Sequence, residues 1–382
     1  MYKRNLNLPN NLSLFLFGPR GTGKSSLINS TYKGSDYIDL LDSGTYLDLL
    51  ARPDRITNYI QNKKDPIIID EIQRVPALLN EIHRKIEQDD LNFILTGSSP
   101  RKLKSAEANL LAGRALKYSL FPLTAAELGS DFDIKHSLTY GMLPSLYDPK
   151  KDELDPEKYL ESYVEVYLRE EVMQEGLVRN LEDFSRFLEV ASFSQAQQLN
   201  LSELARESAV SRKVAESYFS ILIDLLLAYE LPVFSKRAKR RLVSQAKFYY
   251  FDVGVYNTLR PKGILDRGVG DAGVLLESLV MQELMATNKY FDLDFDLYYW
   301  RTRSGLEVDF VLYGESGFYA IEVKSKQQIY EDDIRNLKEF SSDYPEAKAF
   351  VVYGGDKKLS FGEVEAVPVV DFLRDLPEYL SS

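Results

Sequence analysis

The chain has 382 residues, which is enough for about two to four domains that each bury a core. Apolar residues make up 45% and charged residues 27%, as in folded globular proteins, so a disordered chain is excluded. The sequence lacks both an uncharged apolar run of roughly 18 residues and an apolar stretch of signal-peptide length near its start. We therefore expect a cytoplasmic protein with no membrane partner.

The sequence has no Cys and two His, which excludes disulfides, thiolate metal sites, iron–sulfur clusters and Cys nucleophiles. Any bound metal ion must therefore have oxygen ligands. The 47 Lys and Arg residues against 58 Asp and Glu residues give a net charge of −11. A nucleic-acid partner would therefore need a local basic patch on an acidic molecule.

A short apolar run at 12–17 is followed at once by a glycine-rich segment at 18–25 and then by a predicted helix start. The spacing to Lys24 and Ser25 fits G-x-x-x-x-G-K-[ST], in which loop amides and a helix N-terminus surround phosphates. We expect Lys24 to reach the β- and γ-phosphates of ATP and Ser25 to bind Mg²⁺. The predicted ATP-binding residues are Gly18, Pro19, Arg20, Gly21, Thr22, Gly23, Lys24, Ser25 and Ser26.

A second run, at 65–69, is apolar after Asp65 and is followed by Asp70 and Glu71. Such a run is typical of a strand buried on both faces. Asp70 is predicted to hold Mg²⁺ directly or through water, and Glu71 to polarise the attacking water as a general base. The alternative is that both carboxylates cap a helix.

A third apolar run, at 91–95, ends in small polar residues that include Thr96 and Ser98. The carboxyl ends of parallel strands meet at one edge of a sheet, where ligands bind. Ser98 or Thr96 is therefore a candidate to bond the γ-phosphate or the attacking water. A simple loop cap is the alternative.

Five segments together resemble the AAA+-type prokaryotic ATPases whose C-terminal half is a domain of unknown function. These segments are residues 18–25, 70–76, 95–99, 111–114 and 121–124, and the resemblance covers nearly the whole chain. It implies that Arg114 is an arginine finger, which would complete the site of a neighbouring subunit in a homo-oligomer. The alternative is that Arg114 starts a strand at 115–121 and caps a loop.

The middle of the chain is predicted to hold a helix-turn-helix. Ser202 and Ser211 are expected to start its two helices, and a basic segment at 235–241 lies where a wing hairpin would follow. A local basic patch is what an acidic DNA-binding protein requires. The predicted DNA contacts are Arg206, Arg212, Lys213, Lys236, Arg237, Lys239, Arg240 and Arg241. The alternatives are a protein contact and a solvated turn.

Near the C-terminus, residues 305–324 alternate polar and apolar positions across a Gly-bracketed turn, which predicts a hairpin with Glu315 and Ser316 at its tip. This register sets Asp309 opposite Glu322, with their Cβ atoms about 5 Å apart. One face would carry Glu307, Asp309, Glu322 and Lys324, and the other Val308, Phe310, Ile321 and Val323. Two carboxylates this close need a cation between them, which predicts a Mg²⁺ site.

This hairpin resembles the core of PD-(D/E)xK nucleases. The resemblance implies that Asp309 and Glu322 bind Mg²⁺ or Mn²⁺ and that Lys324 orients the water or stabilises the transition state. It also implies an acidic helix residue, for which Glu277 is the best match. The alternative is a solvated sheet face that binds no metal, with an ion pair between Glu307 and Lys324.

We therefore expect a multidomain α/β chain. A P-loop parallel sheet would occupy residues 1–130, a helical lid 131–198, a winged helix-turn-helix 199–255, and a restriction-endonuclease-like α/β domain 256–382. The predicted function is Mg²⁺-dependent ATP binding and hydrolysis coupled to DNA binding, with metal-dependent DNA cleavage by the last domain. The alternative is a nucleotide-dependent switch whose C-terminal domain only binds DNA or a protein partner.

Overall fold

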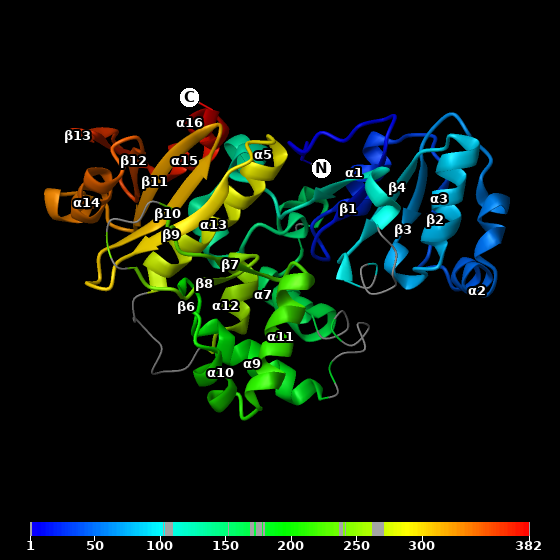
Figure 1. The fold of residues 1–382 in the computed structure, drawn as a ribbon, viewed down its shortest axis with the longest axis horizontal. Helices are drawn as coiled ribbons and strands as arrows, with labels where there is room; N and C mark the ends of the chain where they lie inside the picture. Colours follow the sequence, from blue (N-terminus) through cyan, green and yellow to red (C-terminus); the bar gives the residue numbers. More distant parts are fainter. Residues whose placement is uncertain are drawn as a thin grey trace. The chain divides into compact units, whose positions relative to one another are not determined.

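The computed structural model describes residues 2–101, 103, 110–151, 153–168, 172, 178, 180–236, 240, 242–261 and 271–381. The chain forms two compact units, which are drawn in Figure 1. The N-terminal unit comprises Leu6–Pro122 and Asp224–Leu227, and the C-terminal unit comprises Met1–Asn5, Leu123–Ile223 and Ala228–Ser382. Among the residues that the structure describes, no helix has the length and apolar character needed to span a membrane.

The N-terminal unit contains a five-stranded sheet in the order β2-β3-β4-β1-β5, with every pairing parallel. Its strands are β1 (Ser13–Phe17), β2 (Tyr37–Asp39), β3 (Ile67–Asp70), β4 (Phe93–Gly97) and β5 (Ala115–Ser119). Its helices are α1 (Lys24–Thr31), α2 (Ser43–Ala51) and α3 (Leu78–Asp89), with 3₁₀ turns at Pro53–Tyr59, Ile72–Arg74 and Leu110–Gly113. The three central strands are buried throughout, because both faces of the sheet are covered. The predicted parallel sheet is confirmed.

The C-terminal unit contains a six-stranded sheet, β13-β14-β12-β11-β10-β9, and a three-stranded sheet, β6-β8-β7. The smaller sheet consists of β6 (Gln197–Gln198), β7 (Ala228–Leu231) and β8 (Lys247–Tyr250). The larger consists of β9 (Asp296–Arg301), β10 (Glu307–Gly314), β11 (Gly317–Lys324), β12 (Lys348–Tyr353), β13 (Leu359–Phe361) and β14 (Val364–Pro368). It is a mixed sheet, because β11, β12 and β14 pair in parallel and the outer pairings are antiparallel.

Helices surround these sheets. They are α5 (Ala125–Leu128), α6 (Ile134–Tyr140), α7 (Pro156–Ser162), α9 (Leu181–Ser192), α10 (Leu201–Glu207), α11 (Arg212–Asp224), α12 (Val253–Leu259), α13 (Asp271–Tyr290), α14 (Arg335–Asp343), α15 (Val369–Arg374) and α16 (Leu376–Ser381). A π-helical segment spans Tyr163–Leu168, and 3₁₀ turns lie at Gly129–Asp131, Pro144–Tyr147, Pro149–Lys151 and Glu331–Ile334. Helix α13 packs on one face of the larger sheet and α14 on the other, which gives the unit two core layers.

The three domains expected after residue 130 share one compact unit. The reason is a common core: Leu123, Phe132 and Met142 pack in the same apolar cluster as Leu279 of α13 and Phe310 of β10. The C-terminal compact unit already includes Leu123, and the domain boundary at residue 130 stays a prediction. Divisions within the C-terminal unit at residues 198 and 255 stay predictions.

The hairpin of β10 and β11 has the predicted register, with Gly314 opposite Gly317 and Phe310 opposite Ile321. The predicted apolar face is wrong for Val308. A bulge against β9 between Val308 and Val311 shifts the alternation, so Val308 packs in the α14 layer while Phe310 packs in the α13 layer. Period-two counting cannot anticipate such an extra residue.

The two predicted helix starts have different outcomes. Ser211 caps α11, because its Oγ accepts the N–H of Val214 at 3.3 Å. The prediction for Ser202 is wrong, since α10 begins earlier and Asn200 is its cap. The Asn200 side chain accepts the N–H of Glu203, as expected of a residue type that caps helices at least as well as Ser.

Candidate functional site

The loop after β1 has a backbone that requires glycine at several positions. Gly21 and Gly23 have φ values of +83° and +93°, in the left-handed region that side chains disfavour. A Cβ on Gly18 would lie 2.3 Å from the carbonyl oxygen of Leu120. The loop is therefore held tightly against the neighbouring backbone, and it leads into α1 at Lys24.

Lys24 is 7% exposed, and its ammonium group lies over its own loop. Its Nζ donates to the carbonyl oxygens of Gly18 at 2.8 Å and Pro19 at 3.2 Å. Gly23, the N-cap of α1, provides no side-chain acceptor for the first-turn amides. Backbone amides at a helix N-terminus and a nearby lysine form an arrangement suited to phosphate groups.

Asp70, at the end of β3, lies beside Ser25 at the start of α1. The Ser25 Oγ donates to Asp70 Oδ2 at 3.0 Å, so the two predicted Mg²⁺ ligands are adjacent. The hydroxyls of Thr96 and Tyr37 also donate to the Asp70 carboxylate, which is 6% exposed. Ser25 and Asp70 supply the oxygen ligands that Mg²⁺ prefers, and they fit an ion bound together with a nucleotide.

Sequence reasoning missed Tyr37, a residue of β2 that follows no recognisable motif. Burial, and then its hydrogen bond to Asp70, raise the pKa of the Tyr37 hydroxyl. The hydroxyl therefore stays protonated near neutral pH and remains a donor to the carboxylate. Its position orients Asp70.

Glu71 follows Asp70 in the left-handed conformation, with φ +61°. Its N–H donates to Thr96 Oγ1 at 3.2 Å, and its carboxylate accepts the side-chain amide of Gln73. The same Gln73 Nε2 donates to Ser98 Oγ at 3.2 Å. Glu71 and Ser98, predicted from separate strands, are thus joined through a glutamine that sequence reasoning missed, although it lies two positions after Glu71.

Arg114 lies just before β5, at the surface of the N-terminal unit. Its guanidinium pairs with Glu87 of α3, and 37% of its side chain is exposed. The structure describes a single chain, so the arginine-finger role in a homo-oligomer stays a prediction.

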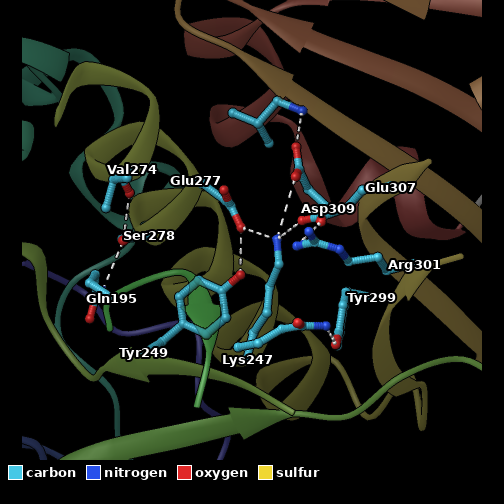
Figure 2. A network of polar contacts seen from close by, with 12 residues as sticks. Gln195, Lys247, Tyr249, Val274, Glu277, Ser278, Tyr299, Arg301, Glu307 and Asp309 are labelled. Carbon is cyan, nitrogen blue, oxygen red and sulfur yellow. Dashed lines mark hydrogen bonds and ion pairs between the residues drawn. The ribbon is translucent and has the colours of Figure 1, made fainter. Parts of the chain in front are cut away.

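Lys247, which sequence reasoning did not single out, lies among the predicted nuclease-like carboxylates (Figure 2). Its side chain is 2% exposed. Its Nζ lies 2.8 Å from Glu277 Oε1, 2.6 Å from Glu307 Oε1 and 3.6 Å from Asp309 Oδ1. Glu277 comes from α13, the other two carboxylates come from β10, and Lys247 begins β8. We call these four residues the Lys247 cluster.

Other donors also contact the carboxylates of the Lys247 cluster, and one of them, Tyr249, shares Glu277 Oε1 with Lys247. Tyr249 donates to Glu277 Oε1 at 2.6 Å, Arg301 lies 2.9 Å from Glu307 Oε2, and the Val323 N–H donates to Asp309 Oδ2 at 2.8 Å. Figure 2 shows the carboxylates turned toward the ammonium group. The cluster is an ion network in which Lys247 contacts all three carboxylates.

Burial alone would lower the pKa of Lys247. Its Coulombic interactions with Tyr249 and then with the cluster's three carboxylates outweigh burial and raise that pKa well above its usual value. Burial, and then the charge of Asp309, raise the pKa of Glu277 to about 7. Lys247 is therefore the permanent charge of the cluster.

Glu322 and Lys324 form a separate pair on β11, with Lys324 Nζ 2.6 Å from Glu322 Oε1. Glu307 pairs with Lys247 and Arg301, so the ion pair expected between Glu307 and Lys324 is replaced by these contacts. Within the described ranges, no group of three or more His, Cys, Asp or Glu residues is arranged to hold a metal ion. The carboxylates predicted to bind Mg²⁺ or Mn²⁺ do not fit one, because Lys247 lies against Glu277 and Asp309.

Most of the described basic residues predicted to contact DNA have acidic partners. Arg206 lies near Glu203 and Glu207, Arg212 pairs with Glu216, Lys236 with Asp296, and Arg240 with Glu339 and Asp343. Lys213 is exposed on α11. Arg237, Lys239 and Arg241 lie outside the described residues. The basic patch is therefore partly neutralised by the protein itself.

Three family models match consecutive parts of the chain. Residues 10–129 match a family described as an AAA domain. Residues 131–266 and 272–372 match two domains of unknown function, DUF8612 and DUF4143. These descriptions support the AAA part of the predicted resemblance and name no nuclease.

Relatives of low sequence identity align along most of the chain. An uncharacterized protein of Mycobacterium tuberculosis is 26% identical over 373 residues, which cover 94% of this chain and 80% of that protein. An uncharacterized protein of Methanocaldococcus jannaschii is 25% identical over 372 residues, covering 87% and 80%.

Among solved structures, the Orc1 protein of Aeropyrum pernix in complex with DNA aligns at 14% identity, covering 66% of this chain and 87% of that chain, with a TM-score of 0.26. A signal-transduction ATPase with numerous domains from Pyrococcus horikoshii aligns at 16% identity, covering 74% and 45%, with a TM-score of 0.22. TM-scores this low do not establish a shared fold. The parallel sheet, the phosphate-type loop and the family match agree, however, and together they support a P-loop ATPase domain of the AAA type at residues 10–129.

Proposed function

We propose that this chain is a Mg²⁺-dependent ATP hydrolase that works as a nucleotide-dependent switch. The observation that carries the proposal is the convergence of Lys24, Ser25, Asp70 and Glu71 at the carboxyl end of the parallel sheet. These side chains supply a phosphate-binding cation, two oxygen ligands for Mg²⁺ and a carboxylate beside them. This set serves phosphoryl transfer, in which positioning and charge stabilisation do most of the work.

Each of these residues has a distinct task. Lys24 exchanges the carbonyls of Gly18 and Pro19 for the β- and γ-phosphate oxygens. Ser25 and Asp70 would hold Mg²⁺, and the charge of the bound ion would offset the negative charge that develops on the phosphates. Glu71 accepts the proton of the attacking water, and Ser98 donates toward the γ-phosphate or that water.

The C-terminal unit, in this proposal, binds a partner without cleaving it. The Lys247 cluster supports the switch over the nuclease, because an ammonium group lies where the nuclease resemblance places a metal ion. Helices α10 and α11 followed by the antiparallel pair β7 and β8 have the order of a winged helix, which keeps DNA as the candidate partner. Replacing Arg212 and Lys213 with Ser should then weaken DNA binding and flatten its salt dependence.

The central test is phosphate release from ATP by the purified full chain with Mg²⁺. We expect turnover in the wild type and its loss in Lys24→Ala. Lys33→Ala, which removes an exposed lysine just past α1, is the matched control and should behave as the wild type. Equal turnover in Lys24→Ala would contradict the proposal. In the same preparations, Mn²⁺-dependent and Asp309-dependent nicking of plasmid DNA would overturn the switch in favour of the nuclease.

A further inference from the structure

Lys247 enters the carboxylate network from a part of the chain that the nuclease resemblance does not include. It begins β8 of the small sheet, whereas Glu277 lies on α13 and Asp309 on β10. Its 2% exposed side chain carries a charge that must be compensated within the protein. The position of this ammonium group is therefore set by three separate elements.

The contacts of Lys247 are those of a central cation. Three carboxylates lie within 3.6 Å of Nζ, and the ring of Tyr299 has its centroid 5.4 Å away. A metal ion bound by Glu277 and Asp309 would have to share their oxygens with this ammonium group. Like charges at such a distance repel strongly in a buried site.

We propose that Lys247 takes the place of a metal ion in the C-terminal unit. Its ammonium group prevents divalent cations from binding between Glu277 and Asp309, and it links β8 to α13 and β10. Lys247 thus explains why the carboxylates predicted to bind a metal ion do not fit one. Removing its ammonium group should create a binding site for a divalent cation.

Charge balance gives the direction of this change. Lys247 and Arg301 supply two positive charges against the three carboxylates of the cluster. Lys247→Met keeps an unbranched side chain of similar length but removes one of these two positive charges, so Glu277 and Asp309 lose their shared cation and only Arg301, beside Glu307, remains. Oxygen ligands in that state favour Mn²⁺ or Mg²⁺. The variant should therefore gain a binding site that the wild type lacks.

The experiment measures Mn²⁺ binding to the nucleotide-free full chain by electron paramagnetic resonance of the free ion. All proteins carry Asp70→Asn, so that the Ser25 and Asp70 pair contributes nothing. We expect Lys247→Met to bind about one Mn²⁺ per chain, roughly tenfold or more tighter than the protein that keeps Lys247. Adding Asp309→Asn to Lys247→Met should abolish the gained site.

Two results would overturn the proposal. The first is that the protein that keeps Lys247 binds Mn²⁺ and that Asp309→Asn abolishes this binding. The second is a folded Lys247→Met protein with no gained site. If Lys247→Met does not fold, Mn²⁺ binding is compared between two proteins that keep Lys247, one with Asp309 and one with Asp309→Asn. Equal and negligible Mn²⁺ binding in both supports the proposal that Lys247 excludes the ion. The outcome is independent of the proposed ATP hydrolysis, because no nucleotide is present.

Discussion

Two buried lysines, one in each unit, have different partners. Lys24 donates to backbone carbonyls of its own loop, whereas Lys247 lies among three carboxylates from other elements. The two side chains are nearly equally buried, at 7% and 2% exposed. Burial of a lysine therefore does not by itself indicate a ligand site.

The partners decide what each lysine can do. Neutral carbonyls are weaker acceptors than phosphate oxygens, so Lys24 can leave them when a nucleotide binds. Lys247 cannot leave its carboxylates without removing the cation from three partly buried negative groups. Lys24 can therefore exchange its carbonyl contacts for a ligand, whereas the carboxylates around Lys247 hold it in place and leave no room for one.

The largest expected effect is on stability. Lys247→Met should lower the free energy of unfolding by roughly 3 kcal/mol, because it leaves the partly buried carboxylates of Glu277 and Asp309 without their shared cation. Chemical denaturation of the full chain, monitored in the C-terminal unit by fluorescence of Trp300, measures this change. Lys338→Met removes the exposed pair with Glu331 and should cost at most about 1 kcal/mol. Similar losses in both variants would show that Lys247 is an ordinary ion-pair residue.

Nucleotide affinity should show the next largest effect. Lys24→Ala removes the cation that meets the phosphates, and we expect ATP to bind roughly 100-fold more weakly. Calorimetric titration with ATP and Mg²⁺ provides the measurement, and Lys33→Ala is the control. Wild-type affinity in Lys24→Ala would remove the lysine from the phosphate site.

Turnover should separate Glu71 from the binding residues. Glu71→Gln keeps a side chain of the same size but cannot accept the proton of water, so phosphate release should slow by roughly 100-fold while ATP still binds. Asp70→Asn is the comparison, because it should impair Mg²⁺-dependent binding as well. If Glu71→Gln loses binding and turnover equally, Glu71 has a structural role.

The smallest effect concerns Gln73, which positions Glu71 and Ser98. Gln73→Leu removes the amide that joins them, and we expect kcat to change by roughly three- to tenfold with little change in KM. Gln61→Leu, at an exposed position of the same unit, should leave both constants unchanged. An altered KM with an unchanged kcat would place Gln73 in binding instead of in orientation.

The N-terminal unit was predictable because its signals are local. The apolar runs before Gly18, Asp70 and Thr96 became the central strands β1, β3 and β4, since strands buried on both faces are continuously apolar. The loop motif likewise requires a contiguous stretch of sequence. The hydroxyl of Tyr37 was not predictable, because strand order β2-β3 decides that it lies beside Asp70.

The C-terminal unit was less predictable because its contacts are distant in the sequence. A lysine in the otherwise apolar run 246–251 signals that a buried charge needs a partner. The sequence does not say which carboxylate it meets, and Glu277 is 30 positions away. The bulge in β10 also redirected Val308, which a strict alternation assigns to the wrong layer.

The most direct test counts Mn²⁺ bound by the wild-type chain with and without a non-hydrolysable ATP analogue. If Lys24 binds the phosphates and Lys247 excludes a metal ion from Glu277 and Asp309, the chain binds about one Mn²⁺, and only when the analogue is present. Lys24→Ala should then lose this Mn²⁺ binding. An ion bound without nucleotide and lost in Asp309→Asn would contradict the account.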